Sequence, residues 1–373
     1  MSFWSLPGPS LYLEDVEEAI REGTSVVTRF PGGVPEGFER AMKERLQKVL
    51  GWRSLDASDA GEDILGFLYG ELCPSTSAAY LPSISGFAAQ PELRGLVMWI
   101  DGVPAAEQPR WAAFVRAYSD ASRAIETFDR AVFALVLSGP QASDSVPDEA
   151  AFVTRDFRSS VDPIELFVLA MQDLVRRSMP REHKALHAQA VASLAQWDWR
   201  LATVLIDARL EDVLKPEPLL ERFAAERGWC AETPRLWQDG TADGPAGSPV
   251  PHSAVLLASG DVRGVRHRLW SAQAAVLLPL IEERRVELIA AHARGIRFPV
   301  TLDGREIGDP LDLSIGQLAW HLDEVGCPAA VRKNVYRLRR MRNALAHMEP
   351  VEGSDALHRQ LLPAPPSRHG PSG

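Results

Sequence analysis

The stretch Thr24–Leu50, TSVVTRFPGGVPEGFERAMKERLQKVL, decides the fold class of the first part of the chain. Residues 24–30 are mostly β-branched or apolar and predict a strand, and residues 31–37 are rich in Gly and Pro and predict a loop. Residues 38–50 are rich in helix formers and predict a helix. A strand, a glycine-containing loop and a helix, in that order, are the first half of a parallel α/β unit.

Further apolar runs extend this pattern. Leu96–Asp101 (LVMWID) and Ala131–Ser138 (AVFALVLS) predict two more strands, and the amphipathic run Leu11–Ile20 predicts an opening helix. Strands that alternate with helices are typical of an α/β layer with a mostly parallel sheet. We therefore expect an α/β domain over residues 1–145.

The loop after the first strand has the setting of a phosphate-binding loop. Gly32, Gly33 and Gly37 lie between a strand and a helix, where backbone amides and a helix N-terminus can face an anion. A Walker A loop would continue with a lysine and a serine or threonine. Here Phe38 and Glu39 follow instead, so both the phosphate-binding cation and the magnesium-binding hydroxyl are missing.

The run ending in Asp101 resembles a Walker B strand, but Gly102 stands where a hydrolytic glutamate would be expected. The order and spacing of these segments resemble an AAA- or STAND-type P-loop domain that has lost its catalytic residues. The resemblance implies weak nucleotide-binding positions at Gly32, Gly33, Gly37 and Asp101. The alternatives are plain turns for the glycines and a helix cap for Asp101. We expect no productive ATP hydrolysis and a regulatory or protein-interaction role.

Helical periodicity dominates residues 146–235. Asp162 is suited to cap a helix that begins at Pro163, and a second helix is expected over residues 183–205. Its residues Trp197 and Trp199 are better explained as core or boundary aromatics than as stacking platforms for bases. Such a bundle resembles the helical lid of AAA and STAND proteins. Residues 236–250, rich in Gly, Pro and Asp, are expected to form a linker.

The remaining sequence predicts an all-helical domain over residues 251–352, apart from one hairpin. A β-hairpin is expected around Asp303-Gly304, within residues 296–310. The expected helices cover residues 262–292 with an interruption or kink at Pro279, residues 313–320 onward with Ser314 as a cap, and residues 329–347. The Pro- and Gly-rich residues 353–373 are expected to be a disordered tail.

The last of these helices ends in the motif Arg342–His347, RNALAH. Asn343 and His347 are four residues apart and therefore share one face of a helix, with Arg342 at the edge of that face. Metal-free RNA cleavage needs a base for the ribose 2′-hydroxyl, an acid for the leaving 5′-oxygen and a fixed cation for the phosphate. Histidine, with an ordinary pKa of ~6.5, can serve as base and acid, and arginine supplies the cation. Asn343 can orient the imidazole or bind the phosphate.

The R-N-x-x-x-H pattern resembles the signature of HEPN domains, and the resemblance covers about Val250 to Val351. It implies an all-helical fold, a homodimer, and metal-independent cleavage of RNA by Arg342, Asn343 and His347 without a cofactor. It also implies a prokaryotic toxin or antiphage system with partner proteins. Some HEPN domains are non-catalytic, so the alternative is an adaptor that uses both of its domains for assembly.

The motif residues also have purely structural explanations. Asn343 can cap or bridge helices, and Arg342 can pair with a nearby acid. His347 can be a histidine at a helix C-terminus, where the macrodipole favours it, because Pro350 ends the helix shortly afterwards. The two interpretations differ in whether these side chains line an open cleft or are satisfied within a core.

The charge distribution bears on the same question. The chain has a formal net charge of −10 and a pI near 5.5, so its surface as a whole does not attract nucleic acid. A basic cluster nevertheless precedes the motif and is the expected RNA-binding surface. Its members are Arg332, Lys333, Arg337, Arg339 and Arg340. The alternative is a solvated helix face that pairs with Glu282, Glu283 and Glu287.

Length and composition indicate the class of protein and the number of domains. With 373 residues, 46% hydrophobic and 24% charged, the chain suggests a soluble protein of two or three domains. Neither a membrane-spanning run nor a signal peptide is recognisable, so a cytoplasmic location is expected. The Cys and His residues lack the spacing of a disulfide framework or a metal site, so no metal is expected. These residues are Cys73, Cys230, Cys327, His252, His267, His292 and His321.

Overall fold

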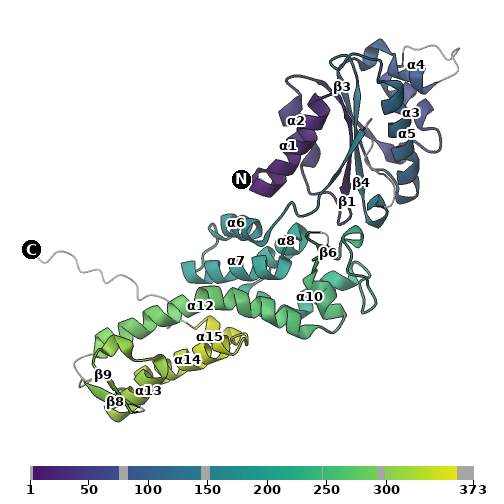
Figure 1. Ribbon diagram of the computed structural model, residues 1–373. Coiled ribbons are helices and arrows are strands. Elements are labelled where there is room, and N and C mark those ends of the chain that lie inside the picture. Colours follow the sequence, from purple (N-terminus) through teal and green to yellow (C-terminus); the bar gives the residue numbers. More distant parts are fainter. Residues whose placement is uncertain are drawn as a thin grey trace, which may run out of the picture. The chain divides into compact units, whose positions relative to one another are not determined.

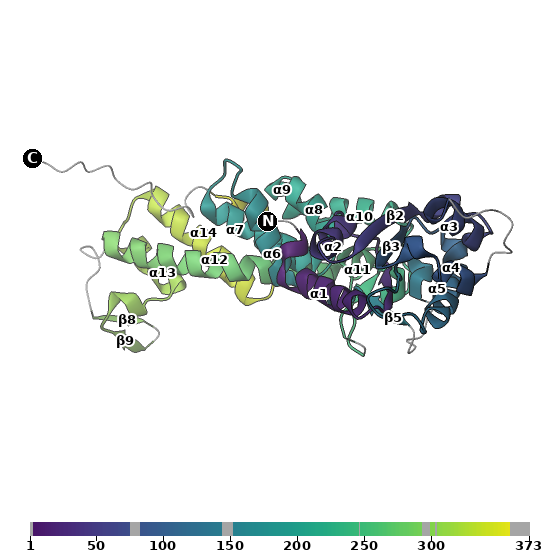
Figure 2. The same cartoon turned by 90° about the horizontal axis from the view of Figure 1, so that it is seen from above.

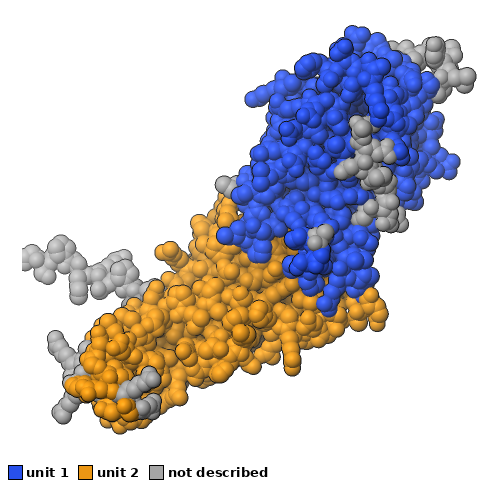
Figure 3. Space-filling view, in the orientation of Figure 1, with its two compact units in different colours: residues 1–165, 233–252 blue, residues 166–232, 253–373 orange. Residues whose placement is uncertain are grey.

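The computed structural model describes residues 3–74, 83–143, 152–245, 247–292, 299–302 and 304–358. The chain forms two compact units, which Figure 3 distinguishes by colour. Unit 1 comprises Met1–Glu165 and Thr233–His252, and unit 2 comprises Leu166–Glu232 and Ser253–Gly373. The expected order, an N-terminal α/β domain with a parallel sheet followed by a helical part, is confirmed.

Unit 1 is built on a five-stranded sheet of order β2-β3-β4-β1-β5, in which every neighbouring pair is parallel. Its strands are β1 (Ser25–Phe30), β2 (Gly51–Asp56), β3 (Leu96–Asp101), β4 (Val132–Ser138) and β5 (Phe152–Asp156). The three predicted strands correspond to β1, β3 and β4. These are the inner strands, whereas the unpredicted β2 and β5 lie at the two edges.

Helices cover both faces of this sheet (Figure 1). One face packs against α1 (Pro7–Arg21) and α2 (Phe38–Leu46), through Val16, Met42 and their neighbours. The other face packs against α3 (Ile64–Leu72), α4 (Ile84–Ala88) and α5 (Gln108–Ala121). The inner strands β3 and β4 are apolar and mostly buried, apart from Asp101 and Ser138 at their ends, as expected for a parallel sheet between two helical layers.

The segment expected as a linker, residues 236–250, contains regular structure. It holds the 3-10 turn η6 (Trp237–Asp239) and strand β6 (Ala242–Asp243), which pairs antiparallel with β7 (Val250–Pro251). Thr241 and Asp243 are buried, and the Asp243 carboxylate accepts hydrogen bonds from the backbone amides of Ser159 and Gly244. Buried, hydrogen-bonded backbone of this kind explains why residues 233–252 belong to unit 1.

In the residues that the structure describes, unit 2 is helical apart from one hairpin. The long helix α12 packs against α7 and α14, and α13 packs against α14, as Figures 1 and 2 show. Its helices are α6 (Pro163–Leu174, which begins in unit 1), α7 (Arg181–Ala195), α8 (Trp199–Asp207), α9 (Leu210–Val213), α10 (Glu217–Ala225), α11 (Ser253–Ala258), α12 (Val262–His292), α13 (Ile315–Glu324), α14 (Ala329–Ala346) and α15 (Gly353–Ala356). The hairpin pairs β8 (Val300–Leu302) with β9 (Arg305–Ile307).

Several local predictions for unit 2 are confirmed. Asp162 accepts the backbone amide of Ile164 at 2.8 Å and caps α6, and Ser314 forms a capping box with Gln317 at the start of α13. The predicted hairpin is present in residues 299–302 and 304–307, whereas residues 296–298 and Asp303 lie outside the described residues. Half-buried Trp197 and Trp199 agree with boundary aromatics.

Other predictions for unit 2 are corrected. The single helix expected over residues 183–205 is two helices, because Gln196 has φ 61° and Asp198 caps α8 through the amides of Arg200 and Leu201. Helix α12 continues through Pro279, so of the two expected alternatives, an interruption or a kink, the interruption is wrong. Helix α15 occupies the start of the expected tail, and residues 359–373 lie outside the described residues. None of the described helices has the length and apolar character needed to cross a bilayer.

Candidate functional site at the end of α14

Helix α14 carries the RNALAH motif at its C-terminal end and packs one apolar face against the rest of unit 2. Val335, Leu338, Met341 and Leu345 recur with helical spacing and are all buried. The carbonyl of Leu345 accepts a hydrogen bond from Trp270 Nε1 of α12 at 2.7 Å, which fixes the end of α14 against α12. The remaining faces of the last turns are left to solvent.

The three motif side chains are exposed. Arg342, Asn343 and His347 form no side-chain hydrogen bond or ion pair with any residue that the structure describes. Asn343 and His347 share a face, as predicted. Arg342 precedes His347 by five residues and therefore lies about 140° around the helix axis from it. Within one chain, the imidazole and this guanidinium do not converge.

These positions bear on the structural explanations for the motif. His347 is the C-cap residue of α14, as the macrodipole explanation requires. Asn343 does not cap or bridge helices, and Arg342 pairs with no acid among the described residues. Instead Arg342 lines a groove with Arg285 of α12 and Leu313, the residue before the cap of α13.

Helix α14 ends in a Schellman motif with an unusual residue at its left-handed position. The amides of Met348 and Glu349 donate to the carbonyls of Leu345 and Ala344, at 3.3 and 2.9 Å. Met348 occupies the left-handed position with φ 60°, where glycine is normally found because a Cβ crowds the following carbonyl. The backbone next to His347 is therefore strained.

Replacing Met348 with glycine is expected to raise the free energy of unfolding by about 1 kcal/mol, because glycine adopts φ > 0 without the steric cost. The side chain is 63% exposed, so little apolar burial is lost. Chemical denaturation of the wild type and Met348→Gly measures the gain. Met348→Ala is the matched control, since it shortens the side chain but keeps the strain. Equal stability of the two variants would contradict this account.

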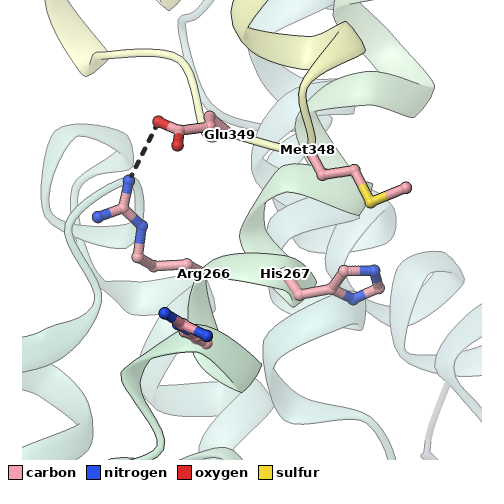
Figure 4. A pocket seen from close by; sticks show the side chains of 5 residues that line it. Arg266, His267, Met348 and Glu349 are labelled. Carbon is pink, nitrogen blue, oxygen red and sulfur yellow. Dashed lines mark ion pairs between the residues drawn. The ribbon is translucent and has the colours of Figure 1, made fainter.

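A cationic pocket of about 490 Å³ adjoins this helix end (Figure 4). It is lined by Arg263, Arg266 and His267 of α12 and by Met348 and Glu349, which directly follow His347. Figure 4 shows Arg266 and Glu349 facing each other, at a nitrogen–oxygen distance of 3.7 Å, with the His267 ring and the Met348 side chain on the other side. Both charged side chains are more than half exposed, so this pair is weak.

Sequence reasoning missed this pocket. In the sequence His267 has no metal-ligand spacing, and nothing there connects the basic run at the start of α12 with α14. The run Arg263, Arg266, His267 and Arg268 is visible in the sequence as a signal. Its position beside the motif depends on how α12 packs against α14, which local sequence does not encode.

The predicted RNA-binding cluster divides into two groups. Arg332 pairs with Asp323 of α13 at 3.3 Å, and Arg337 and Arg340 both pair with Asp355 of α15. Asp355 is buried, so its two ion pairs are better shielded from water than ordinary surface pairs. The other two members, Lys333 and Arg339, are exposed and have no ionic partner among the described residues.

The alternative prediction, that the basic cluster pairs with acidic residues of α12, is therefore wrong. Glu282, Glu283 and Glu287 form ion pairs with Arg284 and Arg285 of their own helix, α12. The acids that pair with α14 come from α13 and α15 instead.

The glycine-rich loop of unit 1 follows β1, which lies between β4 and β5. The connection after β1 leads to the β4 side of the sheet, and the connection after β4 leads to β5 on the other side. The strand order therefore reverses here, and the carboxyl end of β1 is where open α/β sheets usually bind ligands. Gly33 and Gly37 have φ 101° and 80°, as a tight loop requires. However, a Cβ on Gly240 would lie 3.1 Å from the Cα of Gly32, so the backbone of residue 240 covers the loop at Gly32.

Glu39 lies in the first turn of α2, after the loop, and Asp101 ends β3. Glu39 does not face the loop, since its carboxylate accepts a hydrogen bond from Trp52 Nε1 at 3.1 Å and one from Ser54. Asp101 does not cap the following helices, whose N-cap residues are Pro104 and Glu107.

The Asp101 carboxyl has a raised pKa. Burial is the main cause, and the negative charges of Glu39 and of Asp56, its register partner on β2, raise the pKa further. A carboxyl group whose folded-state pKa is raised destabilises the fold when it is ionised. The destabilisation is absent below the unfolded-state pKa of about 4 and grows as the pH rises through the folded-state pKa.

Asp101→Asn is therefore expected to be more stable than the wild type at pH 7 and equally stable near pH 3. The gain should stay below about 1 kcal/mol, because water screens a half-buried carboxylate. Denaturation curves at the two pH values measure it, with the exposed Asp59→Asn as the control. A stability gain that persists at pH 3 would show that charge is not its cause.

The comparisons with known proteins do not place the chain in a family. No protein-family model and no curated protein matches the sequence.

Proposed function

We propose that the protein is a metal-independent endoribonuclease of HEPN type, in which His347 transfers protons, Asn343 orients the imidazole or binds phosphate, and Arg342 stabilises the phosphate charge. The observation that carries this proposal is the exposure of all three polar side chains without a partner among the described residues, beside a cationic pocket. Exposed and unpaired, these side chains are accessible to RNA, and contacts from such side chains to phosphate position a nucleic acid on a protein.

The reaction needs no group beyond these side chains and the RNA. His347 removes the proton of the 2′-hydroxyl, the 2′-oxygen attacks phosphorus, and the bond to the 5′-oxygen breaks with proton return to that oxygen. The products are a 2′,3′-cyclic phosphate and a 5′-hydroxyl. A guanidinium stabilises the charge that develops on the phosphate oxygens.

The angular separation of Arg342 and His347 favours a composite site. Because they lie about 140° apart on α14, one chain does not present both to the same phosphate. Two α14 helices from a homodimer can supply the arginine from one protomer and the histidine from the other. Arg263 and Arg266 would then hold the neighbouring phosphates of the strand.

The biological setting belongs to the same proposal. A toxin or antiphage ribonuclease needs restraint, and unit 1, whose P-loop-like residues lack a lysine and a hydrolytic glutamate, would act as the regulatory and partner-binding part. The competing function is a non-catalytic adaptor in such a system. The ion pairs of Arg332, Arg337 and Arg340 favour the adaptor, since they occupy part of the cluster that would bind RNA.

The test is incubation of the purified full-length protein with total RNA and tRNA in EDTA, beside His347→Ala and Arg342→Ala. Cuts that end in cyclic phosphate and disappear in both variants support the nuclease. Growth toxicity on induction that the same substitutions relieve supports it in cells. Identical RNA profiles and growth for all three proteins would favour the adaptor.

A further inference from the structure

The groove that Arg342 lines has a volume of about 400 Å³ and lies in unit 2 where α12, α13 and α14 meet. This volume is within the range of roughly 300–1,000 Å³ that is typical of small-molecule sites. The other lining residues come from α12, from the 3-10 turn η8 (Pro310–Asp312) and from the first residues after it, up to Ile315 of α13. Arg342 therefore opens onto a concave surface of its own chain.

Five aliphatic side chains line this groove. Three of them, Ile281, Leu313 and Ile315, are buried, whereas Leu278 of α12 and Leu311 of η8 are 39% and 50% exposed. Apolar side chains in a concave site favour a ligand with flat apolar faces, and nucleobases are commonly held between such side chains. The groove therefore has surfaces that a base can cover.

Two side chains of opposite charge line the same groove without a partner. Arg342 and Asp312 are both exposed and form no hydrogen bond or ion pair with any residue that the structure describes. The other charged residues of the lining, Glu282 and Arg285, pair with each other. A guanidinium only donates and a carboxylate only accepts, so a matching ligand has an anionic group for Arg342 and N–H donors for Asp312. A nucleotide has both, together with a flat base.

The turn that carries Asp312 is held in place. The Asp309 carboxylate accepts the backbone amide of Leu311 at 2.8 Å, and the Asp309 carbonyl accepts that of Asp312 at 3.0 Å. From α12, the Arg285 guanidinium donates to the carbonyls of Leu311 and Leu313, at 2.8 and 2.7 Å. The groove is thus formed before a ligand arrives, which lowers the ordering cost of binding.

A second unpaired cation of α14 lies beside the groove. Arg339 precedes Arg342 by three residues, so the two are neighbours on the helix surface. Arg339 Nε lies 3.8 Å from the position that a Cβ on Gly316 would take, next to the groove residue Ile315. Arg339 is exposed and has no ionic partner in the described part of the chain. Two neighbouring guanidiniums suit the repeating phosphates of a nucleic-acid strand.

We propose that this groove binds one nucleotide of the RNA and prefers guanine. The base lies against Leu278 and Leu311, Arg342 holds the adjoining phosphate, and the Asp312 carboxylate accepts the N–H donors of the base edge. Guanine offers two adjacent donors, N1–H and the N2 amino group, to the two oxygens of one carboxylate, whereas each other base offers one donor group there. The inference rests on the proposed function, because the phosphate at Arg342 is the one that is cleaved.

The test measures binding without cleavage, with full-length His347→Ala as the parent protein. Fluorescent single-stranded RNAs of equal length carry one guanine or one adenine among uracils. The parent should bind the guanine-containing RNA about 10-fold more tightly, as expected for a two-bond contact to a base. Adding Asp312→Asn should abolish this preference. Adding Glu324→Gln instead is the matched control, because it removes an exposed carboxylate at the end of α13, away from the groove, and should preserve the preference.

Equal affinity of the parent for the two RNAs would overturn the proposal, and so would a guanine preference that persists in the Asp312→Asn protein. The outcome for the proposed function is separate, because cleavage by the wild type is measured independently. RNA cleavage without a guanine preference in binding would leave the ribonuclease standing and remove the base site. Guanine-selective binding by a protein that cuts no RNA would support the base site and contradict the ribonuclease.

Discussion

Replacing His347 with alanine is expected to abolish metal-independent RNA cleavage and to leave the fold intact. Loss of a positioned acid–base side chain typically lowers a rate by about 10²- to 10⁴-fold. The imidazole is exposed and has no partner among the described residues, so the free energy of unfolding should change by less than about 0.5 kcal/mol. The initial rate of tRNA cleavage in EDTA and a denaturation curve measure the two effects.

His292→Ala is the control for this substitution. His292 is the last residue of α12, and His267 in the pocket beside α14 lies near the first residue of the same helix. At 1.5 Å per residue the two positions are roughly 35–40 Å apart, so His292 does not reach the proposed site. Its variant should cleave at the wild-type rate. Equal cleavage by His347→Ala would remove the proton-transfer role that we assign to His347.

A composite site formed by two protomers predicts a specific result for mixed dimers. Arg342→Ala should also lose activity, by roughly 10²- to 10³-fold, as expected when a contact to developing charge is removed. If each site takes its arginine and histidine from different protomers, a mixed dimer of Arg342→Ala and His347→Ala holds one intact site. Mixing the two inactive variants under conditions of subunit exchange should therefore restore part of the cleavage. No recovery in verified mixed dimers would exclude the composite arrangement.

The sequence predicted the inner strands of unit 1 and not its edges, for a physical reason. β1, β3 and β4 are covered on both faces; β3 and β4 are apolar up to their last residue, and β1 is mostly β-branched or apolar. β2, with the sequence GWRSLD, is largely exposed, and β5 is mostly half-buried, so neither shows such a run. The break between α7 and α8 was missed for a related reason, because Gln196 adopts its positive φ without a glycine or proline to mark it.

Some features of the candidate site were likewise predicted from the sequence, and others were not. The helix, its end near His347 and the shared face of Asn343 and His347 follow from the local sequence and were predicted. The ion pairs of the basic cluster were not, because Asp355 lies in a segment whose composition indicated disorder. The cover over Gly32 was also missed, since Gly240 is far away in the sequence and reaches the loop only in the folded unit.

Gly102 is expected to be one of the most sensitive positions of unit 1. It has φ 66°, and an added Cβ would lie 2.1 Å from Asp56 Oδ1. That oxygen accepts the backbone amide of Ser58 at 2.9 Å and caps the turn that follows β2. Gly102→Ala should therefore cost about 1–2 kcal/mol from the left-handed backbone and about 1 kcal/mol more from the displaced cap. Denaturation of the wild type and the variant measures the sum.

Gly61→Ala separates the two contributions. Gly61 also has a positive φ, 56°, but nothing lies within 4 Å of a Cβ at that position. Its substitution should therefore show only the backbone cost, and equal losses for the two variants would mean that Asp56 moves aside freely.

The geometry at Gly102 also explains why a hydrolytic glutamate does not fit at this position. Gly102→Glu would add the Cβ clash and a third carboxylate beside Asp56 and Asp101, so it should destabilise unit 1 and not create an ATPase. ATP turnover by a stably folded Gly102→Glu protein would refute that conclusion.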